Sequence, residues 1–250
     1  MSAKDTPIAS KKITAAYAGA AAALAGLGAP RTPPGRPPQP ASMAGRIEHT
    51  LLASGATEED VRRVCREAER YEFRAVCCLP RDVAACQRRL EGTMVLVVTV
   101  LDFPLAGGGA AEEECRRAVE AGADEVDMVV DLRALRSGRL VTAARGVRRV
   151  VKAARGRPVK VILETGLLTP EQIAAGAAVA EIGGASFAKT STGYGPRGAS
   201  VEDIRILRAV LGDRLGIKAS GGIRDRAAAE AMVAAGADLI GTSNGPACAG

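Results

Sequence analysis

The sequence predicts a single (β/α)8 barrel, because three features of the chain agree on a closed parallel sheet. Short apolar runs alternate with helical stretches rich in Ala, Glu and Arg from about residue 46 onward, as they do when right-handed crossovers join parallel strands. A weak repeat at 121–124, 183–186 and 235–238 joins a helix to every second strand, with Gly at the helix end. No Gly-x-Gly-x-x-Gly turn follows the first apolar run, which favours a barrel over an open dinucleotide-binding sheet.

Eight strands account for the apolar runs. The runs are rich in Val, Ile, Leu and Ala, as expected for strands buried on both faces. Only residues 246–250 follow the last run, so the eighth helix is expected to be a single turn or missing. In chain order, the expected strands lie at about 46–51, 74–79, 94–101, 125–130, 159–163, 185–189, 215–219 and 237–241.

Residues 1–41 differ in composition from the rest. An Ala/Gly-rich stretch at 13–29 leads into a Pro-rich stretch at 31–40, which has the composition of an extended linker. We therefore expect a disordered extension before a single barrel domain at 42–250. The Ala-rich stretch is too weakly hydrophobic for a membrane span, and an organelle-targeting role for residues 1–41 stays open.

Composition and charge limit the kinds of binding partner that the sequence favours. The net charge is +6, but the arginines are spread over helical segments, and no basic run is interleaved with aromatic residues. A small phosphorylated ligand accounts for the positive charge as well as nucleic acid does, and ordinary solvated helix faces account for it better than either. We expect no nucleic-acid or membrane partner. The six cysteines show no Cys-x-x-Cys spacing and the chain has one histidine, which argues against a metal site and for reduced thiols in the cytoplasm.

Two lysines on apolar runs, Lys189 and Lys218, are the first candidates for chemistry. Seven lysines stand against 27 arginines, and lysine, unlike arginine, can be driven to the neutral amine. With a pKa of about 10.4, an ordinary lysine is neutral in fewer than about one molecule per thousand at pH 7. Burial and a nearby cation lower that pKa, and Lys160 is a third candidate cation. A bias toward arginine codons is the plain alternative.

Asp127 is the candidate acid of the fourth expected strand. Strict alternation in 125–131 places Val126 and Met128 on one face and Glu125 and Asp127 on the other. If the apolar face meets the helices, Asp127 points into the barrel, where a buried carboxylate needs a cationic or hydrogen-bonding partner. An arginine and a lysine are equally suitable partners at this stage.

Two further features concern the first and last strands. Glycine-rich turns at 220–224 and 241–245 end the last two strands, where loops of barrels often cradle a phosphate with backbone N–H groups. The sole histidine, His49, follows Glu48 on the first strand, and alternation sends one of the two out of the barrel. We expect a structural role for His49.

These residues together make the chain resemble the deoxyribose-phosphate aldolase family over roughly residues 46–245. Six motifs in order carry the resemblance, namely Ile47–Leu52, Glu125–Val130, Lys160–Thr165, Phe187–Gly193, Lys218–Arg224 and Ile240–Gly245.

The resemblance implies a class I aldolase without metal or cofactor that reversibly cleaves 2-deoxy-D-ribose 5-phosphate to acetaldehyde and D-glyceraldehyde 3-phosphate. Lys189 would form the Schiff base, Lys218 would lower its pKa and assist proton transfer, and Asp127 would relay protons. The partner would be a small sugar phosphate, and a homodimer stays open. The substrate-binding candidates are Lys160, Thr50, Thr190, Gly221, Gly222, Ser243 and Asn244.

Four positions depart from the family pattern. The family usually has Asp where Glu48 stands, a polar residue at Leu79, Gly at Asp102 and Asn at Asp131. Leu79 and Asp102 suggest a related Schiff-base aldolase for another phosphorylated sugar. The short C-terminus and altered loops suggest a second alternative, a non-catalytic barrel that binds a phosphorylated ligand or a partner protein.

Overall fold

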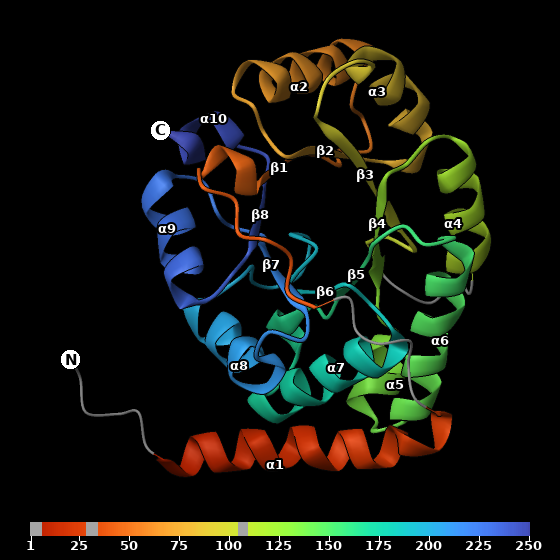
Figure 1. The fold of residues 1–250 in the computed structure, drawn as a ribbon, viewed down its shortest axis with the longest axis vertical. Helices are drawn as coiled ribbons and strands as arrows, with labels where there is room; N and C mark the ends of the chain where they lie inside the picture. Colours follow the sequence, from red (N-terminus) through yellow and green to blue (C-terminus); the bar gives the residue numbers. More distant parts are fainter. Residues whose placement is uncertain (1–6, 29–34, 105–109) are drawn as a thin grey trace.

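The computed structural model describes residues 7–28, 35–104 and 110–250. Its centre is a closed barrel of eight parallel strands, in which each strand pairs with the next along the chain and β8 pairs with β1. Figure 1 looks down the barrel, with helices outside the ring of strands. The predicted (β/α)8 barrel is confirmed.

Each expected strand is present, with its ends displaced by one or two residues at most. The strands are β1 (Ile47–Leu51), β2 (Ala75–Cys78), β3 (Leu96–Leu101), β4 (Glu125–Val129), β5 (Val159–Ile162), β6 (Phe187–Lys189), β7 (Gly216–Ser220) and β8 (Leu239–Thr242). The helices are α1 (Pro7–Leu24), α2 (Glu58–Arg70), α3 (Val83–Leu90), α4 (Ala111–Glu120), α5 (Leu132–Arg136), α6 (Leu140–Ala153), α7 (Pro170–Gly183), α8 (Val201–Leu211), α9 (Arg226–Ala235) and α10 (Gly245–Ala249).

Local sequence explains where the long helices begin and end. Capping boxes start α2, α7 and α8, where the side chains of Thr57, Thr169 and Ser200 accept hydrogen bonds from backbone N–H groups of the first turn. Gly184 and Gly236 end α7 and α9 with φ of 89° and 117°, a left-handed conformation that favours glycine. The small-residue repeat therefore marks real junctions between helix and strand.

The short eighth helix is confirmed. α10 is a five-residue helix that packs against β1 and α9. None of the helices in the described part of the chain is long and apolar enough to cross a membrane.

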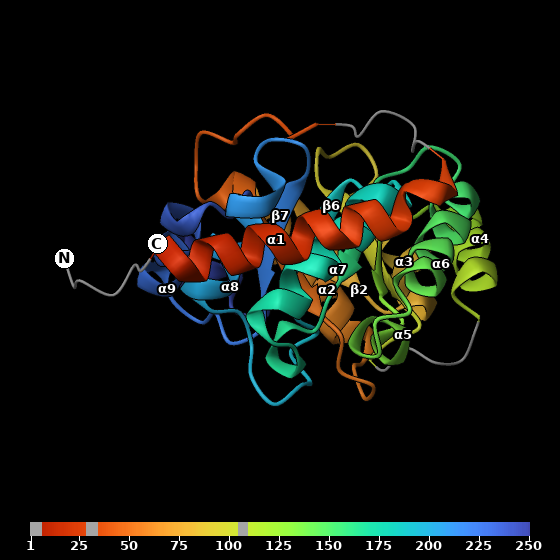
Figure 2. The ribbon, with the colours of Figure 1, turned by 90° about the horizontal axis from the view of Figure 1, so that it is seen from below.

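The N-terminal segment differs from the expected disordered extension. Residues Pro7–Leu24 form α1, which lies across the outer face of α7 and reaches α6 and α8 (Figures 1 and 2). Ala20 and Leu24 are buried, and the Tyr17 hydroxyl donates to Glu181 of α7. Alanine has the highest helix propensity and lets two helices approach closely, so a stretch of low hydropathy still packs. The expectation for residues 1–6 and 29–34 lies outside the described residues.

The remainder of the Pro-rich stretch runs along the end of the barrel where the strands begin. The side chains of Arg36 and Gln39 both donate to Oδ1 of Asp238, at 2.8 and 2.6 Å. Asp238 directly precedes β8, so this segment is tied to the floor of the barrel.

Candidate active site

The candidate active site is a pocket of about 360 Å³ at the carboxyl ends of the strands. In barrels this is the end where the loops after the strands gather functional groups. Lys189 is at its base, and residues from the loops after β1, β6, β7 and β8 form its wall. The lining includes Thr50, Leu52, Thr192, Tyr194, Gly221, Gly222, Arg224, Thr242 and Ser243.

Strand register brings the predicted catalytic residues together. Asp127 on β4 is the register partner of Lys160 on β5, and Lys189 on β6 is the partner of Lys218 on β7. Side chains at the same level of neighbouring strands point to the same side of the sheet. All four therefore point into the barrel, and each is almost fully buried.

Asp127 is the centre of this group. Its Oδ2 accepts from Nζ of Lys189 at 2.7 Å and from Nζ of Lys218 at 2.6 Å, while its Oδ1 accepts from Nζ of Lys160 at 3.0 Å. The sequence left open whether arginine or lysine pairs with Asp127, and the structure shows three lysines. Burial opposes ionisation of the Asp127 carboxyl, but the three ammonium groups hold its pKa well below the usual range.

A second layer of charges lies below Asp127. Glu48 binds Nζ of Lys218, accepts from Arg74 at 2.8 Å and lies 3.3 Å from Nζ of Lys160. Glu125 lies 2.6 Å from Nζ of Lys160 and accepts from Arg74 with both carboxylate oxygens. We call the seven residues the charge ladder: Glu48, Arg74, Glu125, Asp127, Lys160, Lys189 and Lys218.

The ladder separates the lysines by pKa. Burial lowers the pKa of Lys189, and nearby Lys218 lowers it further, against the opposing effect of Asp127. Burial also disfavours the charged forms of Lys218 and Lys160, but each contacts two or more carboxylates, which raise their pKa values. Lys189 is therefore the lysine placed to be a neutral amine.

Glycines shape the upper wall of the pocket. Gly221 and Gly222 have φ of 88° and 77°, and a Cβ on Gly221 would lie 3.0 Å from Cα of Gly198. Only glycine suits this turn, which leaves its backbone N–H groups close to the pocket. Ser243 of the second glycine-rich turn lines the same pocket.

Three of the predicted substrate-binding residues do not line the pocket. Lys160 is buried in the ladder beneath Asp127. The Thr190 hydroxyl donates to the carbonyl of Ser220 at 3.0 Å, which fixes β6 to β7, and the Asn244 amide donates to the carbonyl of Arg224 at 2.7 Å. Thr50, Gly221, Gly222 and Ser243 do line it.

Sequence reasoning missed three charged members of the site. Alternation already placed Glu125 on the same face as Asp127, so its position inside the barrel could have been predicted from the sequence. Nothing in the sequence distinguishes Arg74 from the other arginines, and Arg224 lines the pocket at the end of a predicted turn.

His49 lies outside the barrel, with Nε2 2.7 Å from Glu67 of α2, which supports a structural role.

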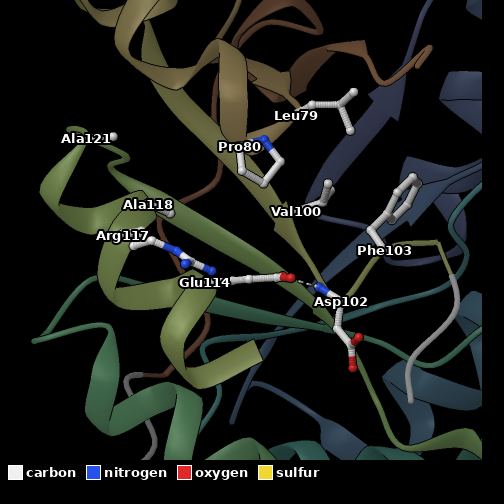
Figure 3. A pocket seen from close by; sticks show the side chains of 9 residues that line it. All are labelled: Leu79, Pro80, Val100, Asp102, Phe103, Glu114, Arg117, Ala118 and Ala121. Carbon is white, nitrogen blue, oxygen red and sulfur yellow. Dashed lines mark hydrogen bonds between the residues drawn. The ribbon is translucent and has the colours of Figure 1, made fainter. Parts of the chain in front are cut away.

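The departures from the family pattern have distinct places. Glu48 belongs to the ladder, and Asp131 caps α5 by accepting from the N–H of Ala134 at 2.9 Å. Leu79 and Asp102 line a neighbouring cavity of about 450 Å³ between the ends of β2 and β3 and helix α4 (Figure 3). The N–H of Asp102 donates to Glu114 at 2.8 Å there.

The two cavities share an aromatic contact. The Phe103 ring, beside Asp102, meets Tyr194 edge to face at 5.4 Å, and Tyr194 belongs to the wall above Lys189. Across the described ranges, no group of three or more His, Cys, Asp or Glu is arranged to hold a metal ion.

Comparisons with known proteins point to one family. The family model for DeoC/LacD family aldolases matches residues 43–248. Deoxyribose-phosphate aldolase of Methanothermobacter thermautotrophicus is 46% identical over 81% of this chain and 92% of the relative, and that of a Geobacillus species is 44% identical over 82% and 93%. The solved tetrameric deoxyribose phosphate aldolase of Aeropyrum pernix is 36% identical, with a TM-score of 0.76 over 82% of this chain and 88% of that one.

Proposed function

The chain belongs to the DeoC/LacD family of aldolases, and from this we propose that it is a class I aldolase that reversibly cleaves 2-deoxy-D-ribose 5-phosphate. The products are acetaldehyde and D-glyceraldehyde 3-phosphate. Relatives at 42–46% identity bear the name deoxyribose-phosphate aldolase. The observation that carries the proposal is the Lys189 amine, whose pKa is lowered, at the base of the pocket and 2.7 Å from Asp127.

The reaction begins with attack of the neutral Lys189 amine on C1 of the open-chain sugar. The resulting carbinolamine loses water, with a proton supplied through Asp127 and Lys218, and leaves an iminium. The C3 hydroxyl then gives up its proton, through Asp127, to Lys218 as the C2–C3 bond breaks. The bonding electrons move to the iminium and form an enamine, and D-glyceraldehyde 3-phosphate leaves.

Turnover requires the enamine to be protonated at C2. Water then attacks the regenerated iminium and releases acetaldehyde and free Lys189. Asp127 contacts both Lys189 and Lys218, so a proton can pass between the substrate side and Lys218 without crossing bulk water. Lys160 acts in this scheme as a fixed counter-charge that keeps Asp127 ionised.

The phosphate is assigned to the upper wall of the pocket. The backbone N–H groups around Gly221, Gly222 and Ser243 supply hydrogen bonds without a bulky side chain in the way. The exposed Arg224 guanidinium lines the same rim and adds a positive charge for a dianion.

A second candidate is an aldolase for a different phosphorylated sugar. The cavity around Leu79 and Asp102 adjoins the pocket through the contact between Phe103 and Tyr194, so changes there would act on the wall of the pocket that Tyr194 forms. Comparing kcat/KM on several sugar phosphates separates the two candidates.

Cellular location and assembly are also proposals. A cytoplasmic location is supported by six free, buried thiols. Self-association is supported by the Aeropyrum pernix relative, whose structure is titled as tetrameric.

The test is to trap the imine. Incubation with deoxyribose 5-phosphate and borohydride, followed by peptide mass spectrometry, should place the adduct on Lys189, with exposed Lys152 as an internal control. Lys189→Met should abolish the adduct. A folded wild-type protein with unmodified Lys189 would contradict the mechanism, and thermal stabilisation by the sugar phosphate without an adduct would favour a non-catalytic binding barrel.

A further inference from the structure

Arg74 is the only arginine of the charge ladder, and it enters the ladder from below. It directly precedes β2, and its side chain is 20% exposed at the floor of the barrel. Its guanidinium donates to Glu48 at 2.8 Å and to both oxygens of Glu125. In the closed strand order, β2 lies across the barrel from β6, which carries Lys189 (Figure 1).

Arg74 and Lys189 are connected through alternating charges. Arg74 contacts Glu48 and Glu125, these carboxylates contact Lys160 and Lys218, and both lysines contact Asp127. Asp127 in turn contacts Lys189. A charge at the floor therefore acts on the Lys189 amine through buried groups that water screens weakly.

The titratable groups facing Lys189 can be counted strand by strand. The residues of β3 and β8 have no titratable side chain, and Cys77 of β2 is a thiol whose pKa burial raises. Tyr194 and Arg224 lie at the pocket wall above. Within the ladder, the charged groups besides Lys189 are three carboxylates, Glu48, Glu125 and Asp127, and three cations, Arg74, Lys160 and Lys218. The buried carboxylate of Glu164, after β5, lies outside the ladder and accepts hydrogen bonds from Thr192 of the pocket wall.

We propose that Arg74 is a positioning residue for Lys189, because its guanidinium completes a one-to-one balance of charges within the ladder. With Arg74 in place, the ladder is neutral when the Lys189 amine is uncharged. Without it, one carboxylate is in excess, and a protonated Lys189 supplies the missing positive charge. The inference rests on the proposed Schiff-base function and adds the group that sets the charge of the nucleophile.

Arginine suits this position better than lysine would. The guanidinium stays protonated in any environment and its fork reaches two carboxylates at once. A cation that never deprotonates keeps the balance fixed across the working pH range. The remaining proton equilibrium in the ladder is then left to Lys189.

The experiment compares the pH profile of kcat/KM, and of borohydride trapping at Lys189, between wild type and Arg74→Met. Loss of one buried positive charge, at an effective dielectric constant of about 20, should raise the pKa of Lys189 by about one unit. The acid limb of the kcat/KM profile then moves upward by about one pH unit, so activity on that limb is about tenfold lower. Arg74→Lys should keep the wild-type profile. The double variant Arg74→Met/Glu125→Gln removes one charge of each sign and should return the limb toward wild type.

Arg208→Met is the matched control. Arg208 pairs with the buried Asp238 at 2.7 Å near the same end of the barrel but outside the ladder, so its loss should lower stability without moving the limb. If Arg74→Met does not fold, Glu125→Gln alone tests the same balance, because it should move the acid limb downward.

The outcomes distinguish the two proposals. A wild-type protein that is never trapped at Lys189 refutes the proposed function. A wild type that is trapped normally, with the limb unmoved in Arg74→Met or in Glu125→Gln, overturns the role of Arg74 alone. A mere structural ion pair would change the unfolding free energy and leave the pH profile in place.

Discussion

Replacing Lys218 by arginine separates its charge from its proton. Lys218 is fully buried, with Nζ 2.6 Å from Asp127 and in contact with Glu48. Lys218→Arg keeps the cation that helps to lower the pKa of Lys189, but an arginine cannot release a proton to the substrate. Losing one general acid or base typically costs about 10²–10⁴ in rate, which is about 3–5 kcal/mol of barrier.

The fold should tolerate this change at a measurable cost. A Cβ on Gly241 would lie 2.9 Å from Cε of Lys218, so the barrel has little spare room there. Overpacking of this kind costs about 1–3 kcal/mol. We expect urea unfolding to report a loss of that size, with the variant folded at 25 °C.

The assay measures kcat by coupled reduction of the aldehyde product and, separately, formation of the Lys189 adduct with acetaldehyde and borohydride. Lys218→Arg should lose turnover while adduct formation at Lys189 persists, and Lys152→Arg on the exposed face of α6 should behave as wild type. Turnover at the wild-type rate in Lys218→Arg would remove Lys218 from proton transfer.

Two further predictions concern stability. Lys160 and Arg74 outweigh burial and lower the pKa of Glu125 from 4.5 to about 2. Its ionised form therefore stabilises the fold above about pH 4.5, and that contribution, about 3 kcal/mol, is lost as the pH falls toward 2. Urea unfolding between pH 7 and 3 should show a smaller loss of unfolding free energy in Glu125→Gln than in wild type, and an equal loss in both proteins would contradict this. Leu24 of α1 is fully buried, so Leu24→Ala should lower the unfolding free energy by about 2–3 kcal/mol and speed proteolysis of the N-terminal segment. The control Ala22→Ser, at an exposed position of the same helix, should change neither. An unchanged rate of proteolysis in Leu24→Ala would mean that the packing of α1 contributes little to stability.

Much of this protein could be predicted from sequence because the signals are local. The alternation of apolar runs and helical segments fixed the number and order of the strands, and the glycines at 184 and 236 marked helix ends through their backbone freedom alone. The two lysines were conspicuous because arginine serves almost everywhere else in the chain. Asp127 followed from the period of a strand.

The rest depended on contacts between residues far apart in the chain. Alternation placed Asp127 inside the barrel but could not say which cation would meet it, because strand register decides that three lysines converge there. α1 was misjudged because its stability comes from packing against α7, which local hydropathy does not measure. Arg74 is one arginine among many in the sequence. Only the closed barrel places it beneath Glu48 and Glu125. There its charge acts on the Lys189 amine through buried groups that water screens weakly.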